Sequence, residues 1–260
     1  MSLDLESLLQ SFGEDEPSGE DLEYDPDFIA LELAAQPKEE HQVGDSVIAG
    51  EEPDYKEVKQ AAVKVMERAH DLRAAVYYAN AALRSEGLPA FAETLAYMRG
   101  CLEQYWPSCH PQLDPDDNDD PTARANAVAG LADNDTILRA LRAIPLTDSR
   151  MMGRFGLREI QIARGEAPGG KDDAHLEESK IASAFKDTPQ EHLAGLLSGV
   201  KAARDHLKAI EAVFDEKVPA QGPDLSPLSR TLFQLEKILD EHVEQPEVEE
   251  EDVEEAADEA

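Results

Sequence analysis

The stretch Tyr105–Asn126, YWPSCHPQLDPDDNDDPTARAN, decides how the middle of this chain is built. Two bulky aromatic residues run into Pro107 and Pro111, five aspartates follow within seven residues, and Pro121 opens the next segment. Aromatic side chains favour a core, carboxylates favour water, and each proline fixes a backbone angle and removes a hydrogen-bond donor. We therefore expect this stretch to end one helix, form an exposed turn and start another helix.

Helical patterns flank this stretch on both sides. Asp25 before Pro26, and Asp54 before apolar residues spaced three and four apart, are typical helix starts. Gly87 separates two further helical segments, and short connections favour antiparallel neighbours. We expect an all-α fold, an antiparallel helical bundle, with helices near residues 3–12, 26–36, 54–66, 72–85, 89–105, 121–131 and 136–143, and a loop over residues 37–53.

The C-terminal part of the sequence predicts a helical hairpin and then an acidic tail. A short helix is expected near residues 175–186, a long one near 189–217 and a last one near 225–243, with facing apolar stripes on the last two. Alternating apolar residues within 145–162 allow a short β-hairpin. From Glu241 to Ala260 there are eleven acidic residues and no lysine or arginine, a composition typical of disorder.

These patterns divide the chain into four parts. The predicted parts are a helical domain over residues 1–163, a linker over 164–174, the helical hairpin over 175–243 and a disordered acidic tail over 244–260. The hairpin is expected to pack on the first domain or to form a small second one.

The formal net charge of −33, with a pI near 4.4, restricts the classes of partner. Nucleic-acid phosphates and anionic membranes would repel such a chain, so cationic protein surfaces are favoured. The sequence has no apolar run long enough to span a membrane, and its first residues lack the features of a signal peptide. We therefore expect a cytoplasmic protein, at most peripheral to a membrane complex. Cys101 and Cys109 are expected to be reduced thiols.

Several short motifs carry a resemblance to a known family. They comprise Pro17, Gly19, Asp21, Leu22, Tyr24 and Asp25; Gly44, Asp45, Val47, Pro53 and Tyr55; His70, Asp71, Leu72 and Arg73; Gly87, Leu88 and Phe91; and Pro145, Leu146, Ser149, Arg150, Gly153, Leu157 and Arg158. With the stretch over 105–126, they resemble the ImpA N-terminal domain of the TssA proteins, the tail-assembly and baseplate components of type VI secretion systems. The resemblance covers residues 10–165, with His70 where the family usually has lysine.

The resemblance implies a non-enzymatic role in assembly. Such proteins contact baseplate, inner-tube and sheath proteins and help to prime tail polymerisation, so the implied mechanism is binding, without a catalytic residue, cofactor or metal. Longer members continue into a module that builds a ring. That module does not follow the helical hairpin here, either because this is a short member or because the chain is incomplete. A monomer or dimer is therefore expected.

Two patterns resemble sites with chemistry. Gly44-Asp45-Ser46-Val47 resembles the nucleophile block of one class of serine esterases, but the Asp-x-x-His element of that class is missing. The Asp114–Asp120 loop resembles a calcium site, but an EF-hand needs glycine and glutamate where Asp119 and Ala125 stand. A structural turn and helix capping by Asp119 and Asp120 are the expected roles. A serine hydrolase using Ser46 and weak calcium binding stay as alternatives.

Four residues are candidates for a protein interface: Trp106, Arg150, Arg154 and Arg158. For the lone tryptophan, packing with Tyr105, Leu113 and Phe91 is favoured over anchoring a partner. Together with Arg164, these arginines are unusual in so acidic a chain, and we expect the four to neutralise the Asp114–Asp120 loop, with an acidic partner as the alternative. A regulatory adaptor, whose acidic tail masks a basic patch on a partner, is the alternative function.

Overall fold

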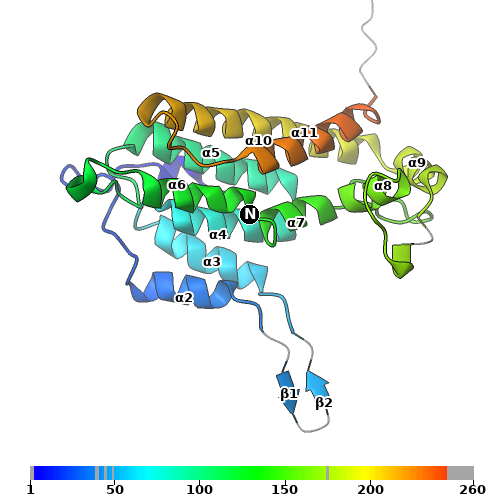
Figure 1. Ribbon diagram of the computed structural model, residues 1–260, viewed down its shortest axis with the longest axis horizontal. Coiled ribbons are helices and arrows are strands. Elements are labelled where there is room, and N and C mark those ends of the chain that lie inside the picture. Colours follow the sequence, from blue (N-terminus) through cyan, green and yellow to red (C-terminus); the bar gives the residue numbers. More distant parts are fainter. Residues whose placement is uncertain (1–2, 39–40, 44–45, 49, 174–175, 245–260) are drawn as a thin grey trace, which may run out of the picture.

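The computed structural model describes residues 3–38, 41–43, 46–48, 50–173 and 176–244. Over these residues the chain is an array of helices with one small β-hairpin (Figure 1). The helices are α1 (Leu5–Leu8), α2 (Pro26–Ala35), α3 (Tyr55–Met66), α4 (Leu72–Glu86), α5 (Leu88–Tyr105), α6 (Thr122–Ala129), α7 (Ile137–Ala143), α8 (Leu157–Ala163), α9 (Glu178–Asp187), α10 (Gln190–Lys217) and α11 (Ser226–Asp240). The predicted all-α fold class is confirmed. No helix in these ranges is both long and apolar enough to cross a membrane.

Capping residues explain where the first helices begin and end. The Asp25 side chain accepts a hydrogen bond from the backbone of Asp27 at 2.9 Å, and Pro26 occupies the first turn of α2. Asp54 caps α3 in the same way. Gly87, with φ +85°, ends α4 and opens α5, because glycine adopts this angle without strain. The predicted starts at Asp25 and Asp54 and the stop at Gly87 are confirmed.

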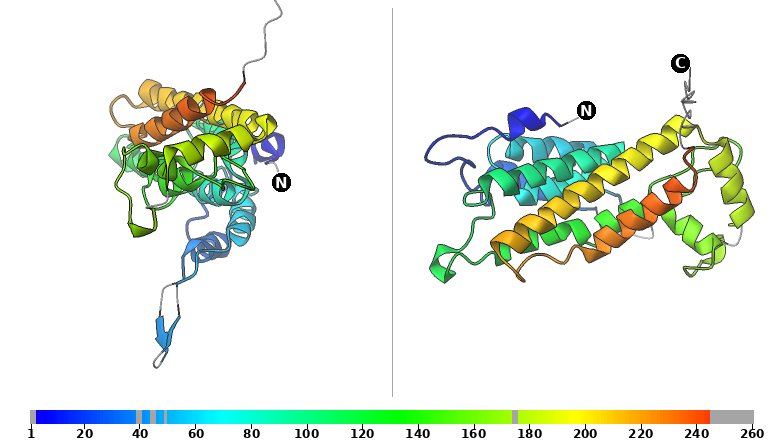
Figure 2. Two further views of the ribbon diagram at one scale, coloured as in Figure 1. Left: turned by 90° about the vertical axis from the view of Figure 1, so that its right-hand side faces the viewer. Right: turned by 90° about the horizontal axis from the view of Figure 1, so that it is seen from above.

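The core is built around α5 and α10, which make the most extensive helix–helix contact in the structure. Gly199 permits their close approach, because a Cβ there would lie 3.0 Å from the backbone nitrogen of Pro89. α11 runs back beside α10 and also contacts α7 (Figures 1 and 2). Buried residues of all these helices belong to one hydrophobic cluster. Whether residues 175–243 are a domain of their own stays a prediction.

A β-hairpin stands within the region where the sequence predicts a loop. β1 (His41–Val43) pairs antiparallel with β2 (Ser46–Ile48), and the hairpin projects away from the helices (Figures 1 and 2). Valine and isoleucine favour strands, but a strand of three residues is too short to show the alternation of apolar and polar residues by which strands are predicted. Gly44 and Asp45 of the esterase-like block lie outside the described residues, and of Ser46 only the backbone is described.

Residues 145–162 form a tight turn and then a helix, rather than a regular hairpin. Leu146 N donates to Phe155 O at 2.8 Å, and Ser149 and Gly153 form a single antiparallel bridge. From Leu157 the chain is helical, as α8. The expected disordered tail over 244–260 lies outside the described residues except for Glu244.

Candidate protein-interaction surfaces

Three of the motifs singled out in the sequence meet at one backbone junction. His70 N donates to Ser18 O at 2.9 Å, His110 N donates to His70 O at 2.9 Å, and Leu72 N donates to His110 O at 2.8 Å. Gly19 is required here, because its φ is +73° and a Cβ would overlap the carbonyl oxygen of Arg68. We call this set of five residues the signature junction.

Ion pairs fix the N-terminal segment onto the signature junction. The buried Asp71 caps α4 and lies 2.6 Å from the guanidinium of Arg73. Arg73 also pairs with Asp21 at 2.8 Å and with Glu23 at 2.9 Å. A buried carboxylate needs such a partner to remain charged. These signature residues therefore serve the fold rather than a binding site.

A serine and a histidine are hydrogen-bonded inside this junction. His70 Nδ1 lies 3.3 Å from Ser18 Oγ, which in turn lies 2.8 Å from Ser108 Oγ. Ser18 and His70 are only 1% and 0% exposed, and His70 Nε2 has no hydrogen-bond partner in the described part of the chain. A nucleophilic serine needs access to substrate and a third group that orients the histidine. The first condition is not met at this pair, because both side chains are buried.

Trp106 closes the C-terminal end of α5 against α10. Its ring meets Phe214 edge-on, with centroids 5.3 Å apart, and it is 9% exposed. Arg124 lies under it, with the guanidinium carbon 4.8 Å from the ring centroid. The predicted packing role holds, and the predicted partner Leu113 lines one pocket with Trp106, whereas Phe91 and Tyr105 lie elsewhere. Phe91 stands fifteen residues earlier on α5, roughly 22 Å along the axis, and Tyr105 packs on His70 with centroids 4.0 Å apart.

Arg124 is the residue that sequence reasoning missed. Its nitrogen atoms donate to the carbonyl oxygens of Trp106 at 2.5 Å, Cys109 at 2.6 Å and Pro111 at 2.9 Å. It is fully buried, which is rare for arginine. The carbonyls belong to the stretch that Pro107 and Pro111 interrupt, so Arg124 donates to backbone oxygens that no helix there can satisfy. Nothing in the spacing marks this arginine as different from an exposed one.

The aspartate loop is held by its own turns. Asp114 Oδ1 accepts from Asp116 N at 2.9 Å, and Asp120 Oδ1 accepts from Thr122 N at 2.8 Å. The bonds from Thr122 lower the pKa of Asp120. Asp120 thus accepts from the first N–H of α6, although the N-cap residue itself is Pro121. Asp119 adopts a left-handed φ of 58° within the turn. In the described ranges no three histidine, cysteine or acidic side chains are grouped to hold a metal ion.

The two cysteines are free and buried, as predicted. Burial raises the pKa of Cys109 to about 11 and places that of Cys101 well above its usual range. The thiolate is the reactive form of cysteine, so neither side chain is a nucleophile at neutral pH.

Residues 148–154 (DSRMMGR) form an ordered loop that we call the basic loop. Asp148 N donates to Thr188 Oγ1 at 2.9 Å, and Ser149 Oγ donates to Asp187 Oδ2 at 2.6 Å, which ties the loop to the end of α9. Met151 at its tip is 81% exposed. The span 137–164 around the loop has six arginines and two acidic residues, although the chain as a whole carries a net charge of −33.

The candidate arginines do not neutralise the aspartate loop, so that prediction is wrong. Arg154 pairs with Asp148 at 2.8 Å and Arg158 pairs with Asp173 at 2.9 Å. Arg150 is exposed and has no ion pair among the described residues. The position of the basic loop depends on its hydrogen bonds to the end of α9 and on the packing of α8. The charges in the sequence do not predict that packing.

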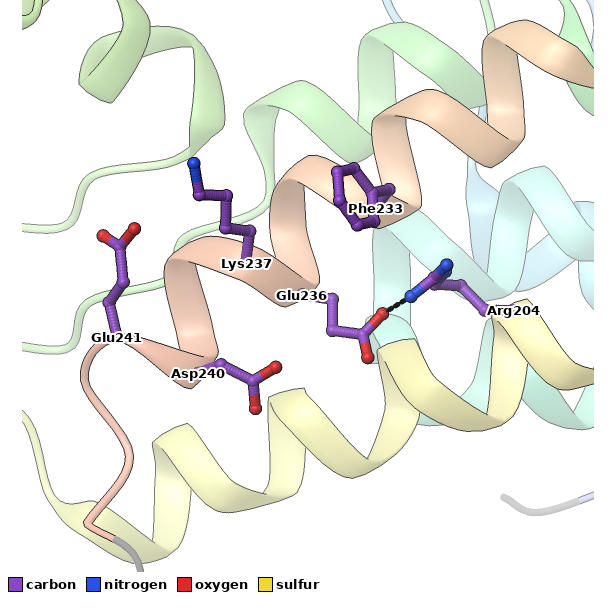
Figure 3. A pocket seen from close by; sticks show the side chains of 6 residues that line it. All are labelled: Arg204, Phe233, Glu236, Lys237, Asp240 and Glu241. Carbon is purple, nitrogen blue, oxygen red and sulfur yellow. Dashed lines mark ion pairs between the residues drawn. The ribbon is translucent and has the colours of Figure 1, made fainter.

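A shallow groove of about 350 Å³ between α10 and α11 is lined by Arg204, Phe233, Glu236, Lys237, Asp240 and Glu241 (Figure 3). Arg204 is paired with Glu236 and lies 5.2 Å from the Phe233 ring centroid. Asp240 pairs with Lys201 at 3.0 Å, and Glu241 pairs with Arg164 at 3.4 Å. The carboxylates of this groove are thus already balanced within the molecule.

Comparison with known proteins identifies the family. Residues 9–133 match the family described as "ImpA, N-terminal, type VI secretion system". The type VI secretion system component TssA1 of Pseudomonas aeruginosa is 38% identical over 239 residues, which cover 92% of this chain and 69% of TssA1. The chain belongs to the TssA family. Its relatives are type VI secretion components, which supports a role in such a system.

A solved structure supports the TssA fold. The N-terminal domain of the TssA component from Burkholderia cenocepacia, which includes the conserved ImpA_N region, matches with a TM-score of 0.75 and covers 94% of each chain. At 22% identity this likeness concerns the fold. The family match over residues 9–133 includes the signature junction and the aspartate loop. The basic loop, residues 148–154, lies outside this match.

Proposed function

We propose that this TssA-family chain is a non-enzymatic assembly component that acts in the cytoplasm, binding baseplate, inner-tube or sheath proteins and priming tail polymerisation. The observation that carries this proposal is the similarity to TssA1 over 92% of the chain. The structure is consistent with binding rather than turnover, because the buried Ser18–His70 pair is closed to solvent and both thiols are buried.

The basic loop is the surface that we assign to a secretion partner. Arg150 and Met151 are exposed at its tip. Arg154 pairs with Asp148, and Arg158, at the start of α8, pairs with Asp173 and lies 3.8 Å from Glu159. The hydrogen bonds that the loop donates to Thr188 and Asp187 order it before binding, which reduces the entropy lost on association. An acidic partner surface suits this loop. Trp106 contributes by packing, since little of its ring reaches solvent.

The test is a binding assay of the purified chain against each baseplate, tube and sheath protein of the same secretion system. We expect Arg150→Glu/Met151→Glu to weaken binding to one of these proteins by about tenfold or more, which corresponds to about 1.4 kcal/mol. The control Lys208→Glu/Phe233→Glu makes the same change of charge at exposed positions of α10 and α11 and should bind as the wild type does. Equal binding by both variants would reject the basic loop, and no binding to any component would reject the assembly role.

A further inference from the structure

The outward side of α2 is apolar. Tyr24, Ile29 and Leu33 are 85%, 45% and 62% exposed. Ile29 and Leu33 lie one helical turn apart on α2. Tyr24 is the residue before the N-cap, a position that often packs against the fourth residue of a helix, here Ile29. Ile29 and Leu33 therefore form one row with Tyr24 at the N-terminal end of the helix, and we call these three residues the α2 face. Phe28 and Leu31 on the same helix are buried in the core.

The α2 face has no cover within the described molecule. α2 packs against α3 and α4 and is the outermost helix of the array, so its far side faces open space (Figures 1 and 2). Met151 and Phe233 are isolated exposed apolar residues, which are common on protein surfaces. Large apolar side chains exposed together on a helix and on the residue just before its N-cap are instead typical of a surface that binds another helix.

Negative charge surrounds the α2 face. Residues 1–37 contain eleven aspartates and glutamates, and no lysine, arginine or histidine precedes Lys38. Arg68 pairs with Asp25 at 2.8 Å and with Asp27 at 2.6 Å, and so balances part of this charge. Glu32, next to Leu33 on α2, is exposed and has no ion pair among the described residues. The row is thus an apolar strip with an acidic margin.

We propose that the α2 face binds an amphipathic helix of a partner protein, with large aliphatic residues on one side and lysine or arginine on its flanks. The aliphatic residues would pack on Tyr24, Ile29 and Leu33, while the flanking cations would lie near Glu32 and the remaining carboxylates. A second copy of this chain does not suit the face, because the same carboxylates would oppose one another, and an anionic bilayer is repelled for the same reason. The face is distinct from the basic loop, which suits an acidic partner.

The experiment measures binding of a fluorescein-labelled amphipathic peptide, LKKLLKLLKKLLKL, to the full chain by fluorescence anisotropy at about 50 mM NaCl, where screening is modest. Ile29→Glu/Leu33→Glu should bind it about tenfold or more weakly than the wild type does. Ala212→Glu/Phe233→Glu makes the same change of charge at exposed apolar positions of α10 and α11 and should bind as the wild type does. Circular dichroism and the thermal midpoint establish that both variants are folded.

A second peptide of the same composition, rearranged to remove the helical period, separates apolar contact from simple charge attraction. It should bind the wild-type chain about tenfold or more weakly. Equal affinity for the two peptides, an unchanged affinity in Ile29→Glu/Leu33→Glu, or no binding of the amphipathic peptide to the wild type would each overturn the proposal. Because the probe is not a secretion component, these outcomes leave the proposed assembly role standing.

Discussion

At the scale of single residues, Arg124 holds the break that follows α5. Its three hydrogen bonds satisfy the carbonyls of Trp106, Cys109 and Pro111. Arg124→Ala would remove all three donors and leave a cavity beneath the Trp106 ring. We expect this variant to lower the free energy of unfolding by about 3–5 kcal/mol, measured by urea denaturation followed through Trp106 fluorescence.

The control for this experiment is Arg139→Ala, because the Arg139 side chain is 66% exposed and lies 3.9 Å from its one carboxylate partner in the described chain, Glu52. We expect it to change the free energy of unfolding by less than about 0.5 kcal/mol. A loss at Arg124 no larger than the loss at Arg139 would show that the three carbonyls find other donors.

His70 makes the fold sensitive to acid. Burial lowers its pKa from 6.5 to about 4. As the pH falls below 6.5 the unfolded chain therefore gains a proton that the folded chain does not accept until about pH 4. The stability that this histidine contributes is fully present above pH 6.5 and is lost as the pH falls, by about 2 kcal/mol between pH 6.5 and 5.

The measurement is urea unfolding at several pH values for the wild type and for His70→Gln, which cannot titrate. We expect the variant to lose about 2 kcal/mol less than the wild type over this interval. Paired carboxylates such as Asp25, whose pKa is lowered by hydrogen bonds from Arg68, contribute mainly below pH 5. The same pH dependence in both proteins would exclude His70 as the source.

At the scale of helices, two glycines of α10 have different roles. Gly199 is buried where α10 crosses the start of α5, and an added Cβ would lie 3.0 Å from Pro89 N and 3.2 Å from Leu88 C. Gly195, one turn earlier, is exposed, and an added Cβ would meet nothing within 4 Å. Gly195→Ala should therefore raise the free energy of unfolding by about 0.5–1 kcal/mol, through helix propensity alone.

Gly199→Ala gains the same propensity but must displace the backbone of α5. We expect it to be about 1–3 kcal/mol less stable than Gly195→Ala, because overpacking a close helix contact carries a cost of that size. Thermal and urea denaturation of the two variants measure the difference. Equal stabilisation by both substitutions would mean that the α5–α10 contact can relax without loss.

At the scale of the whole molecule, the net charge of −33 opposes the compact state through self-repulsion. Salt screens this repulsion, so we expect the thermal midpoint at pH 7.5 to rise between about 20 and 300 mM NaCl by roughly 2–4 °C, equivalent to about 1 kcal/mol. Near the pI of about 4.4 the effect should be small. A midpoint that falls with salt would show that internal ion pairs, such as Arg73 with Asp71, outweigh the repulsion.

Short stretches of sequence encode the helix ends of this protein and the motifs of its family. The caps at Asp25 and Asp54, the glycine stop at Gly87 and the proline end of α5 are encoded within a few residues, and so is the apolar period of each long helix. Local hydrogen bonds and side-chain spacing act over one or two turns, so they can be read without knowing the fold. The signature motifs indicated the TssA family for the same reason.

Contacts between residues far apart in the sequence are set by the packing of the helices. The burial of Arg124, the Ser18–His70 contact across 52 residues and the pairing of Arg158 with Asp173 depend on how whole helices pack. The same holds for the α2 face, because periodicity shows that a helix has apolar residues but not that one side of it is left uncovered. Contacts far apart in the sequence are set by packing of the complete chain, and local propensity carries no information about them.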